Sequence, residues 1–371
     1  MTTDFHAEHV GSLLRPPELL AARAAHQRGD LDAMRLRELE DQAALAAIEV
    51  QNQAGMEVFT DGEMRRATWM AGLLESIGGV TPVTLPPAKW YRAEGEPPRA
   101  ETDFDMVAAN AKLTQKAGHT SVEAAFLAKH APGQFKITMM SSSMGPILWR
   151  PGVSDGVYAT PVELVNDLMA LQIKEIEGLI DQGVTWVQLD SLGYNFVIDE
   201  QFRAGVGMGD VPPQEIFEGT LAVDKQLVRA AKQKYPDVTV GMHFCRGNNR
   251  SAWMSEGGYD GVAERLFGEV GVDRFLLEYD TERAGGFEPL RFVPDGTTVV
   301  LGLVSSKTPR LESPDELRRR VDEAAKYVPL ENLALSPQCG FASTAAGNLL
   351  TVDDERRKLE LVVTTAERIW G

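Results

Sequence analysis

The stretch QGVTWVQLDS, residues 182–191, reads as the end of a helix, a short strand and an acidic strand end. Gly183 supplies the left-handed turn that commonly follows a helix, and the β-branched and aromatic run after it has strand composition. Two more stretches have the same order and also stop at an acid, AGMEVFTDGE (54–63) and VGVDRFLLEYD (270–280). Because helices alternate with strands, the strands are expected to be parallel neighbours.

Five further stretches have strand composition, which brings the expected number of strands to eight. Two of the helices between them begin with a capping sequence that has proline at the first helical position, TPVE (160–163) and SPDE (313–316). Eight such units predict an α/β fold, a closed (β/α)8 barrel of the TIM type, as a single domain over residues 1–371. A doubly wound open sheet is the alternative. The five stretches are EHVGSLL (8–14), FKITMMSSS (135–143), VTVGMHFC (238–245), TVVLGLVSS (298–306) and NLALSPQCG (332–340).

Residues 82–134 break this rhythm and are interpreted as an insertion between the second and third strands. The proline clusters of TPVTLPPAKWYRAEGEPPRAET predict a loop or a small hairpin, and TSVEAAFLAKHA (120–131) is helix-like. We expect the whole segment to pack over one rim of the barrel.

Charge and composition exclude several classes of protein. A net charge of -17 argues against nucleic-acid binding, which needs a basic face. The sequence has no apolar run of about 18 residues and no signal peptide, so we expect no membrane span and a cytoplasmic location. Cys245 and Cys339, the only cysteines, could form a disulfide, remain free or bind a metal. A reducing compartment makes the disulfide the least favoured of the three.

Polar residues gather at the carboxyl ends of the expected strands. In a barrel of this type these ends form the face that carries the active site. The sequence therefore predicts one site to which all eight strands contribute. The residues are Ser12, Asp61, Glu63, the serines of SSSMGP (141–146), Asp190, His243, Cys245, Glu278, Asp280, the SSK of 305–307 and Cys339.

His243 and Cys245 stand two positions apart in GMHFCRGNNR (241–250), so their side chains point to the same face of a strand. Imidazole, thiolate and carboxylate ligands together suit zinc. His243, Cys245, Glu278 and Cys339 would meet from strands five, six and eight. The alternative is that His243 is a hydrogen-bonded core residue and that both cysteines are small buried hydrophobes.

Such a ligand set favours one kind of chemistry. Two thiolates and a carboxylate around Zn²⁺ leave the site with about one negative charge, which favours a thiolate nucleophile over a strongly polarised water. The HExxH motif of zinc hydrolases is absent. Glu278, the weakest ligand of the four, would give way to the substrate. We therefore predict that a small thiol is activated and alkylated.

Other candidates each have a structural alternative. Glu63 is a candidate for substrate binding, or it pairs with a nearby arginine. Asp190 is a candidate acid, or it caps a helix. His9 is a candidate acid or base, or it makes a local hydrogen bond. Arg15 and Arg246 are candidates for binding an anionic group of the substrate, or they are structural.

Five segments in this order resemble the cobalamin-independent methionine synthase family, in particular its short, single-barrel bacterial members. The resemblance covers nearly the whole chain, and the joint occurrence of the segments is what makes it specific. The segments are HVGSLLRP (9–16), TDGEMRR (60–66), MHFCRGN (242–248), LLEYD (276–280) and LSPQCGF (335–341).

The resemblance implies a zinc enzyme that transfers a methyl or alkyl group from a donor to a small thiol, with homocysteine as the leading acceptor. It implies that His243, Cys245, Glu278 and Cys339 bind the zinc. Ser12 and Glu63 match positions that hold the amino acid part of homocysteine, and Asp190 matches a substrate-binding aspartate. Trp149 matches an aromatic residue that stacks on the folate.

The chain departs from the family in two places. It reads Asp190-Ser191-Leu192 where the family usually has Asp-Glu-Pro, so a carboxylate near the substrate is missing. The second barrel of the long family members has no counterpart. The alternatives are thiol addition to an epoxide, as in epoxyalkane:coenzyme M transferases, a metal-free decarboxylase or lyase similar to uroporphyrinogen decarboxylase, and a thiol-binding protein without catalysis.

Overall fold

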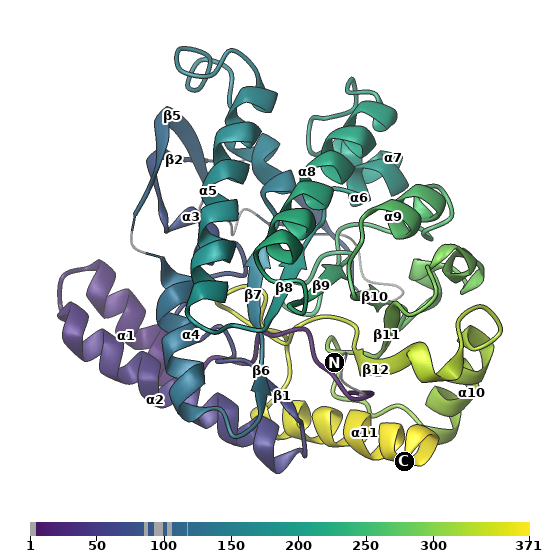
Figure 1. Ribbon diagram of the computed structural model, residues 1–371. Helices are drawn as coiled ribbons and strands as arrows, with labels where there is room; N and C mark the ends of the chain where they lie inside the picture. The colour runs from purple at the N-terminus through teal and green to yellow at the C-terminus, as the bar shows by residue number, and fades with distance from the viewer. Residues whose placement is uncertain (1–4, 85–87, 93–98, 102–105, 117) are drawn as a thin grey trace.

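The computed structural model describes residues 5–84, 88–92, 99–101, 106–116 and 118–371, and a parallel sheet forms its centre (Figure 1). Six strands pair in the order β12-β11-β10-β9-β8-β7, each parallel to its neighbours. Nearly every residue in them is buried, as expected when both faces of a sheet are covered. Six predicted strands and the α/β fold are thereby confirmed. The strands are β7 (Ile137–Met140), β8 (Trp186–Asp190), β9 (Thr239–Phe244), β10 (Arg274–Glu278), β11 (Thr298–Val304) and β12 (Leu333–Pro337).

Helices lie between these strands, and α5 and α8 run side by side along the sheet (Figure 1). The hydroxyl of Thr160 accepts the backbone N–H of Glu163 at 3.3 Å, which confirms the predicted cap of α5. Helix α10 also begins where predicted, but Ser313 makes no capping hydrogen bond. Among the described residues, no helix combines the length and apolar character needed to cross a bilayer. The helices are α1 (Pro17–Gln27), α2 (Ala33–Gln53), α3 (Ala71–Leu74), α4 (His119–His130), α5 (Pro161–Asp181), α6 (Asn195–Ile198), α7 (Glu200–Gly205), α8 (Pro213–Lys234), α9 (Ala263–Glu269), α10 (Pro314–Ala324) and α11 (Val352–Trp370), with 3-10 turns η1 (Ser142–Leu148), η2 (Glu282–Ala284), η3 (Glu288–Phe292) and η4 (Leu330–Asn332).

The first two predicted strands differ from the other six. The second is reduced to β1 (Val58–Phe59), which pairs in parallel with β6 (Gln134–Phe135) just before β7. The first, 8–14, is not a regular strand, so that prediction is wrong. The N–H of Glu8 bonds to β12 at 2.9 Å, whereas that of Leu13 bonds to Gly62 beyond β1 at 3.1 Å. The segment thus changes partner along its length, which prevents a regular ladder.

The predicted insertion, 82–134, contains two structurally different parts. A long antiparallel ribbon of β2 (Ile77–Val83) and β5 (Met106–Gln115) begins before residue 82, and β3 (Ala88–Trp90) pairs with β4 (Arg99–Glu101). Helix α4 instead packs Ala124 and Leu127 into the main core beside the sheet. Residues 85–87, 93–98, 102–105 and 117 of the predicted insertion lie outside the described residues.

The C-terminal helix holds the end of the first predicted strand. Glu355 of α11 is 2% exposed, and its carboxylate accepts the backbone N–H of Leu14 at 2.8 Å. Burial raises the pKa of Glu355 to about 8. The folded protein therefore binds a proton here at pH values where the unfolded chain has released it, so this contribution to stability is lost as pH rises towards 8.

We expect wild-type protein to lose about 2 kcal/mol of unfolding free energy between pH 6 and pH 8 through this group, at 1.4 kcal/mol per pKa unit. Glu355→Gln keeps an oxygen acceptor for Leu14 and should remove that part of the slope. Urea unfolding midpoints of both proteins at the two pH values measure the difference. Equal slopes in the two proteins would contradict a raised pKa.

Candidate metal centre and adjoining pocket

A cavity of about 620 Å³ lies at the carboxyl ends of the sheet strands, and only part of the predicted set of polar residues lines it. Asp61, Glu278, Asp280 and residues 305–307 are not among its lining residues. Its lining divides by chemistry. One part is polar and includes Ser12, Glu63, Asp190, His243, Cys245 and Cys339. The other part is apolar and includes Trp69 before α3, Trp90 of β3, Ile147 and Trp149 at η1, and Phe202 and Met208 at α7.

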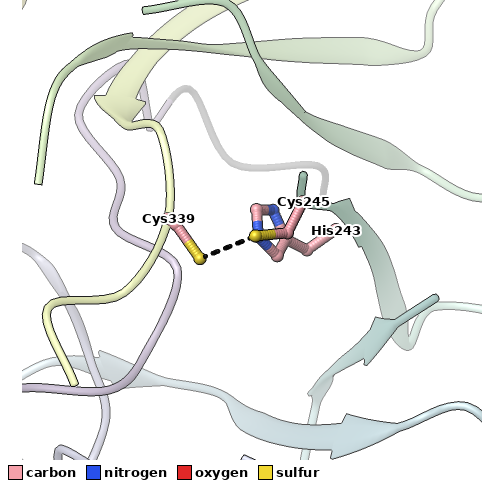
Figure 2. Close-up of side chains that lie close together, drawn as sticks. All are labelled: His243, Cys245 and Cys339. Atoms are coloured by element: carbon pink, nitrogen blue, oxygen red, sulfur yellow. Dashed lines mark hydrogen bonds between the residues drawn. The ribbon is translucent and has the colours of Figure 1, made fainter. Parts of the chain in front are cut away.

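His243, Cys245 and Cys339 converge in the polar part of the cavity (Figure 2). One ligand atom from each lies within 4.8 Å of the others, and the two Sγ atoms are 3.2 Å apart. The residues come from the end of β9, the residue after it and the loop after β12. Both cysteines are free thiols. Strands distant in sequence therefore bring an imidazole and two thiols to one point.

The ring of His243 is oriented for a ligand. Its Nδ1 lies 3.1 Å from the carbonyl oxygen of Leu276, so we assign the ring proton to Nδ1. Its Nε2 is buried and has no hydrogen-bond partner among the described residues. A buried, unpartnered nitrogen lone pair beside two thiols is what a metal-binding histidine presents.

The two thiols cannot easily ionise together unless a cation is present. The adjacent Cys339 thiol, followed by burial, raises the pKa of Cys245 well above its ordinary value. The backbone N–H of Gly247 points at the Cys245 sulfur at 3.2 Å, an arrangement that supports negative charge there. A bound divalent cation would supply the missing countercharge. The donor set therefore fits a soft divalent metal such as zinc.

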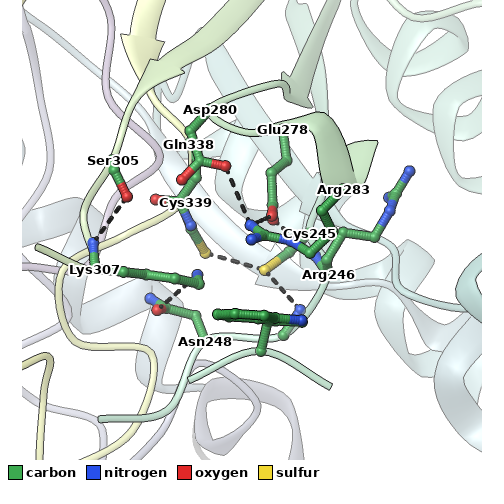
Figure 3. Close-up of polar contacts among 12 residues, drawn as sticks. Cys245, Arg246, Asn248, Glu278, Asp280, Arg283, Ser305, Lys307, Gln338 and Cys339 are labelled. Atoms are coloured by element: carbon green, nitrogen blue, oxygen red, sulfur yellow. Dashed lines mark hydrogen bonds and ion pairs between the residues drawn. The ribbon is translucent and has the colours of Figure 1, made fainter. Parts of the chain in front are cut away.

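Glu278 was expected as a fourth ligand, but among the described residues it is not part of this group. Its carboxylate accepts the backbone N–H of Arg246 at 2.8 Å and pairs with Arg283 (Figure 3). Although burial opposes ionisation, Arg283 and further cations lower the pKa of Glu278 to about 2. The carboxylate is thus ionised and orders the turn that follows Cys245.

Glu63 lies in the cavity wall with one carboxylate oxygen unsatisfied. Its Oε1 accepts the hydroxyl of Thr138 at 2.8 Å, whereas Oε2 is buried without a partner among the described residues. Glu63 has φ 58°, a left-handed conformation that is uncommon for glutamate. Strain at a pocket residue with a free oxygen suggests that a ligand completes its hydrogen bonds.

Asp190 and Ser12 also line the cavity. Burial, and then the charge of Glu63 against the opposing effect of His243, raises the pKa of Asp190 to about 6. The carbonyl of Ser12 accepts the N–H of Phe341 at 2.8 Å, which fixes Ser12 beside the loop that carries Cys339. A Cβ on Gly340 would come within 2.0 Å of the Ser12 hydroxyl, so this close approach requires glycine.

Ser191, which stands after β8 where the family usually has glutamate, bonds to a carboxylate from another part of the chain. Ser191 donates to the buried carboxylate of Asp224 on α8 at 2.8 Å, and Tyr194 donates to the same carboxylate at 3.0 Å. Neither Ser191 nor Asp224 lines the cavity. The carboxylate therefore stands behind the wall and orders the loop after β8.

Like Glu278, two further predicted site residues, His9 and Arg15, do not line the cavity. His9 is 1% exposed and its Nε2 lies 3.1 Å from the carbonyl of Val58; burial, followed by the charge of Lys136, lowers its pKa to about 3. The low pKa keeps the imidazole neutral at physiological pH, and its bond to Val58 is the local hydrogen bond of the structural alternative. Arg15 donates four hydrogen bonds to backbone carbonyls, so its side chain braces these loops, as its structural alternative predicts.

Trp149 lies where an aromatic partner for the substrate was expected. It lines the cavity, and its indole N–H donates to the carbonyl of Tyr158 at 2.9 Å, which fixes the ring. The sequence analysis missed much of the surrounding apolar wall, including Trp69, Phe202 and Met208. Trp69 precedes α3, Phe202 lies in α7 and Met208 follows it, where no strand-end pattern identifies them.

Comparison with known proteins gives likenesses over nearly the whole chain. Residues 5–367 match the family described as "Cobalamin-independent synthase, Catalytic domain". The Bacillus subtilis protein YxjH, described as uncharacterized, is 36% identical over 99% of this chain and 95% of its own length. A methionine synthase from Thermococcus kodakarensis is 23% identical over 90% of this chain and 85% of its own. A crystal structure solved as a candidate vitamin-B12 independent methionine synthase from Listeria monocytogenes is 29% identical, covers 99% of this chain and 98% of its own, and has a TM-score of 0.73.

Proposed function

Since the chain belongs to the cobalamin-independent synthase catalytic-domain family, we propose that it is a transferase that moves a methyl group from a donor to the sulfur of a small thiol. Homocysteine is the leading acceptor, because the named relatives are methionine synthases. The convergence of His243, Cys245 and Cys339 in the wall of the cavity is the observation that carries the proposal. A metal-free lyase would leave these three side chains without a role.

We propose that these three residues hold a zinc ion. Zinc sites in enzymes commonly use three protein ligands and keep one position for substrate. When bound, zinc lowers the pKa of a thiol below its free value of about 8.5, so that the sulfur is nucleophilic at neutral pH. Glu278 holds the turn that presents Cys245 and the N–H of Arg246.

The polar wall of the cavity supports an amino acid thiol as substrate. In this proposal Glu63 binds the ammonium group through its unpartnered oxygen, and Ser12 contributes a hydroxyl beside it. Asp190, with its pKa near 6, holds the proton that the departing donor takes when its bond to the methyl carbon breaks. The thiol proton is released when the sulfur becomes the nucleophile, so protons balance over the turnover.

We also propose that the sheet belongs to one closed barrel domain over residues 1–371. The hydrogen bonds of residues 6–8 to β12, and of Leu13 to the turn after β1, support this proposal. β1 also pairs with β6, which directly precedes the edge strand β7, so the same N-terminal region contacts the sheet at both of its edges.

Cobalt substitution tests the metal and its thiol together. Cobalt-loaded wild-type protein should show the charge-transfer absorption of cysteine sulfur bound to Co²⁺, and homocysteine should change that spectrum at saturating concentration. Coenzyme M and glutathione serve as competing thiols of different shape and charge. The proposed function would be contradicted if the protein bound no cobalt, or if none of the three thiols changed the cobalt spectrum.

A further inference from the structure

Arg150 differs from the other arginines that the structure places in the interior. Every other arginine described as buried or half-buried makes a hydrogen bond or an ion pair with its side chain. Arg150 is half-buried, and its guanidinium has no such partner among the described residues. The chain has a net charge of -17, yet no described carboxylate pairs with this half-buried guanidinium, so its N–H groups are available to a ligand.

The guanidinium of Arg150 is partly dehydrated at the cavity. Burial lowers the pKa of Arg150, as expected when water is removed from a cation without a carboxylate taking its place. Such a group gains most from a ligand that restores its hydrogen bonds. A guanidinium presents a planar fork that fits a carboxylate with two parallel N–H bonds.

The backbone around Arg150 is fixed, so the side chain projects from a rigid support. The N–H of Arg150 donates to the hydroxyl of Ser154 at 3.0 Å, and its carbonyl accepts the N–H of Ser154 at 2.8 Å. Trp149, the preceding residue, is held by Tyr158 at 2.9 Å. Among the lining residues that the structure describes, Arg150 is the one arginine or lysine.

The position of Arg150 assigns it to the apolar part of the cavity. Trp149 packs on the same apolar cluster as Phe202 and Met208, which also line the cavity. The thiol is expected at the cysteines and its ammonium group at Glu63. The second substrate, the donor, is therefore left with an aromatic and apolar wall that has a single cation at its edge.

We propose that Arg150 binds a carboxylate on the alkyl donor, and that the body of this donor is apolar or aromatic. The inference rests on the proposed function for the identity of the donor, but the anion site itself needs no metal. Arg15 and Arg246 do not compete for this role. Arg15 is saturated by backbone carbonyls, and Arg246 donates to the carbonyl of Gly257 and stacks on Tyr259.

Two probes that differ only in charge test the site. 2-Naphthoate and 2-naphthamide share a flat apolar body, and their binding can be followed by quenching of tryptophan fluorescence. Wild-type protein should bind naphthoate at least about 10-fold more tightly than naphthamide. Arg150→Gln should weaken naphthoate binding about 10-fold and change naphthamide binding less than about 2-fold. Arg150→Lys should recover part of the preference.

The controls separate this inference from the proposed function. Arg229→Gln, at an exposed arginine of α8, removes the same charge outside the cavity and should leave both affinities unchanged. Cys339→Ser should keep the preference for naphthoate whatever its metal content. Saturating homocysteine should leave naphthoate binding within about 2-fold, since the two occupy different parts of the cavity. The assignment would be overturned if Arg150→Gln weakened the binding of both probes equally. It would also be overturned if wild-type protein showed no saturable binding of naphthoate, or if homocysteine displaced naphthoate.

Discussion

Cys339→Ser protein is expected to purify with almost no zinc, whereas wild-type protein should carry about one zinc per chain. Serine oxygen is a poor substitute for a thiolate in a site that already has a sulfur and an imidazole, so affinity should fall by more than about 100-fold. Cys245→Ser should have the same effect, because its sulfur is 3.2 Å from that of Cys339. Elemental analysis of the purified proteins measures the metal, and thiol alkylation should be lost with it.

The zinc content of Glu278→Gln is the control for that of Cys339→Ser. Its carboxylate is committed to Arg246 and Arg283, so we expect the variant to keep most of its zinc. Thermal melting should show that Cys339→Ser remains folded, since a serine of similar size fills the same space. Full zinc content in a folded Cys339→Ser protein would contradict the proposed ligands, and complete zinc loss in Glu278→Gln would restore Glu278 as a ligand.

Glu63→Gln is expected to lower kcat/KM with homocysteine by about 30-fold or more, because removing one partner of a buried charged pair costs about 2–5 kcal/mol. The carboxylate has one buried oxygen without a partner, which the substrate ammonium group would satisfy. Glutamine keeps the size of the side chain and its bond to Thr138 but removes the charge. Zinc content should be unchanged.

4-Mercaptobutyrate provides the matched substrate, because it is homocysteine without the amino group. The Glu63→Gln variant should use it about as well as wild type does, so the two proteins should differ only with the ammonium-bearing thiol. If the variant loses activity equally with both thiols, Glu63 supports the fold of the site and does not recognise the ammonium group.

The sequence predicts the sheet strands and the convergence of His243, Cys245 and Cys339 for a physical reason. Short apolar runs that end at an acid or a cysteine are buried parallel strands, and the ends of parallel strands meet at one edge. His243 and Cys245 share a face because they are two residues apart on β9, and Cys339 follows another strand. Their convergence therefore follows from the repeat of strands and helices.

The predicted site residues that lie apart from the three-residue cluster share a different feature. His9 and Arg15 stand near Ser12 in sequence, but local sequence does not show which carbonyls an irregular segment will meet, and both side chains turn towards backbone oxygens. Glu278 ends its strand as predicted, yet Arg283, five residues later in the 3-10 turn η2, pairs with its carboxylate. Arg150 lies in a loop without periodicity, so only its contacts reveal that it lacks a partner.

X-ray absorption at the zinc edge tests the central claim most directly. For zinc-loaded wild-type protein, we predict a first shell with sulfur from both cysteines and nitrogen from His243. Adding homocysteine should add one more sulfur to that shell, since the thiol is activated by the metal that these residues hold. A shell of nitrogen and oxygen alone, or a shell whose sulfur content is unchanged by saturating homocysteine, would contradict the account.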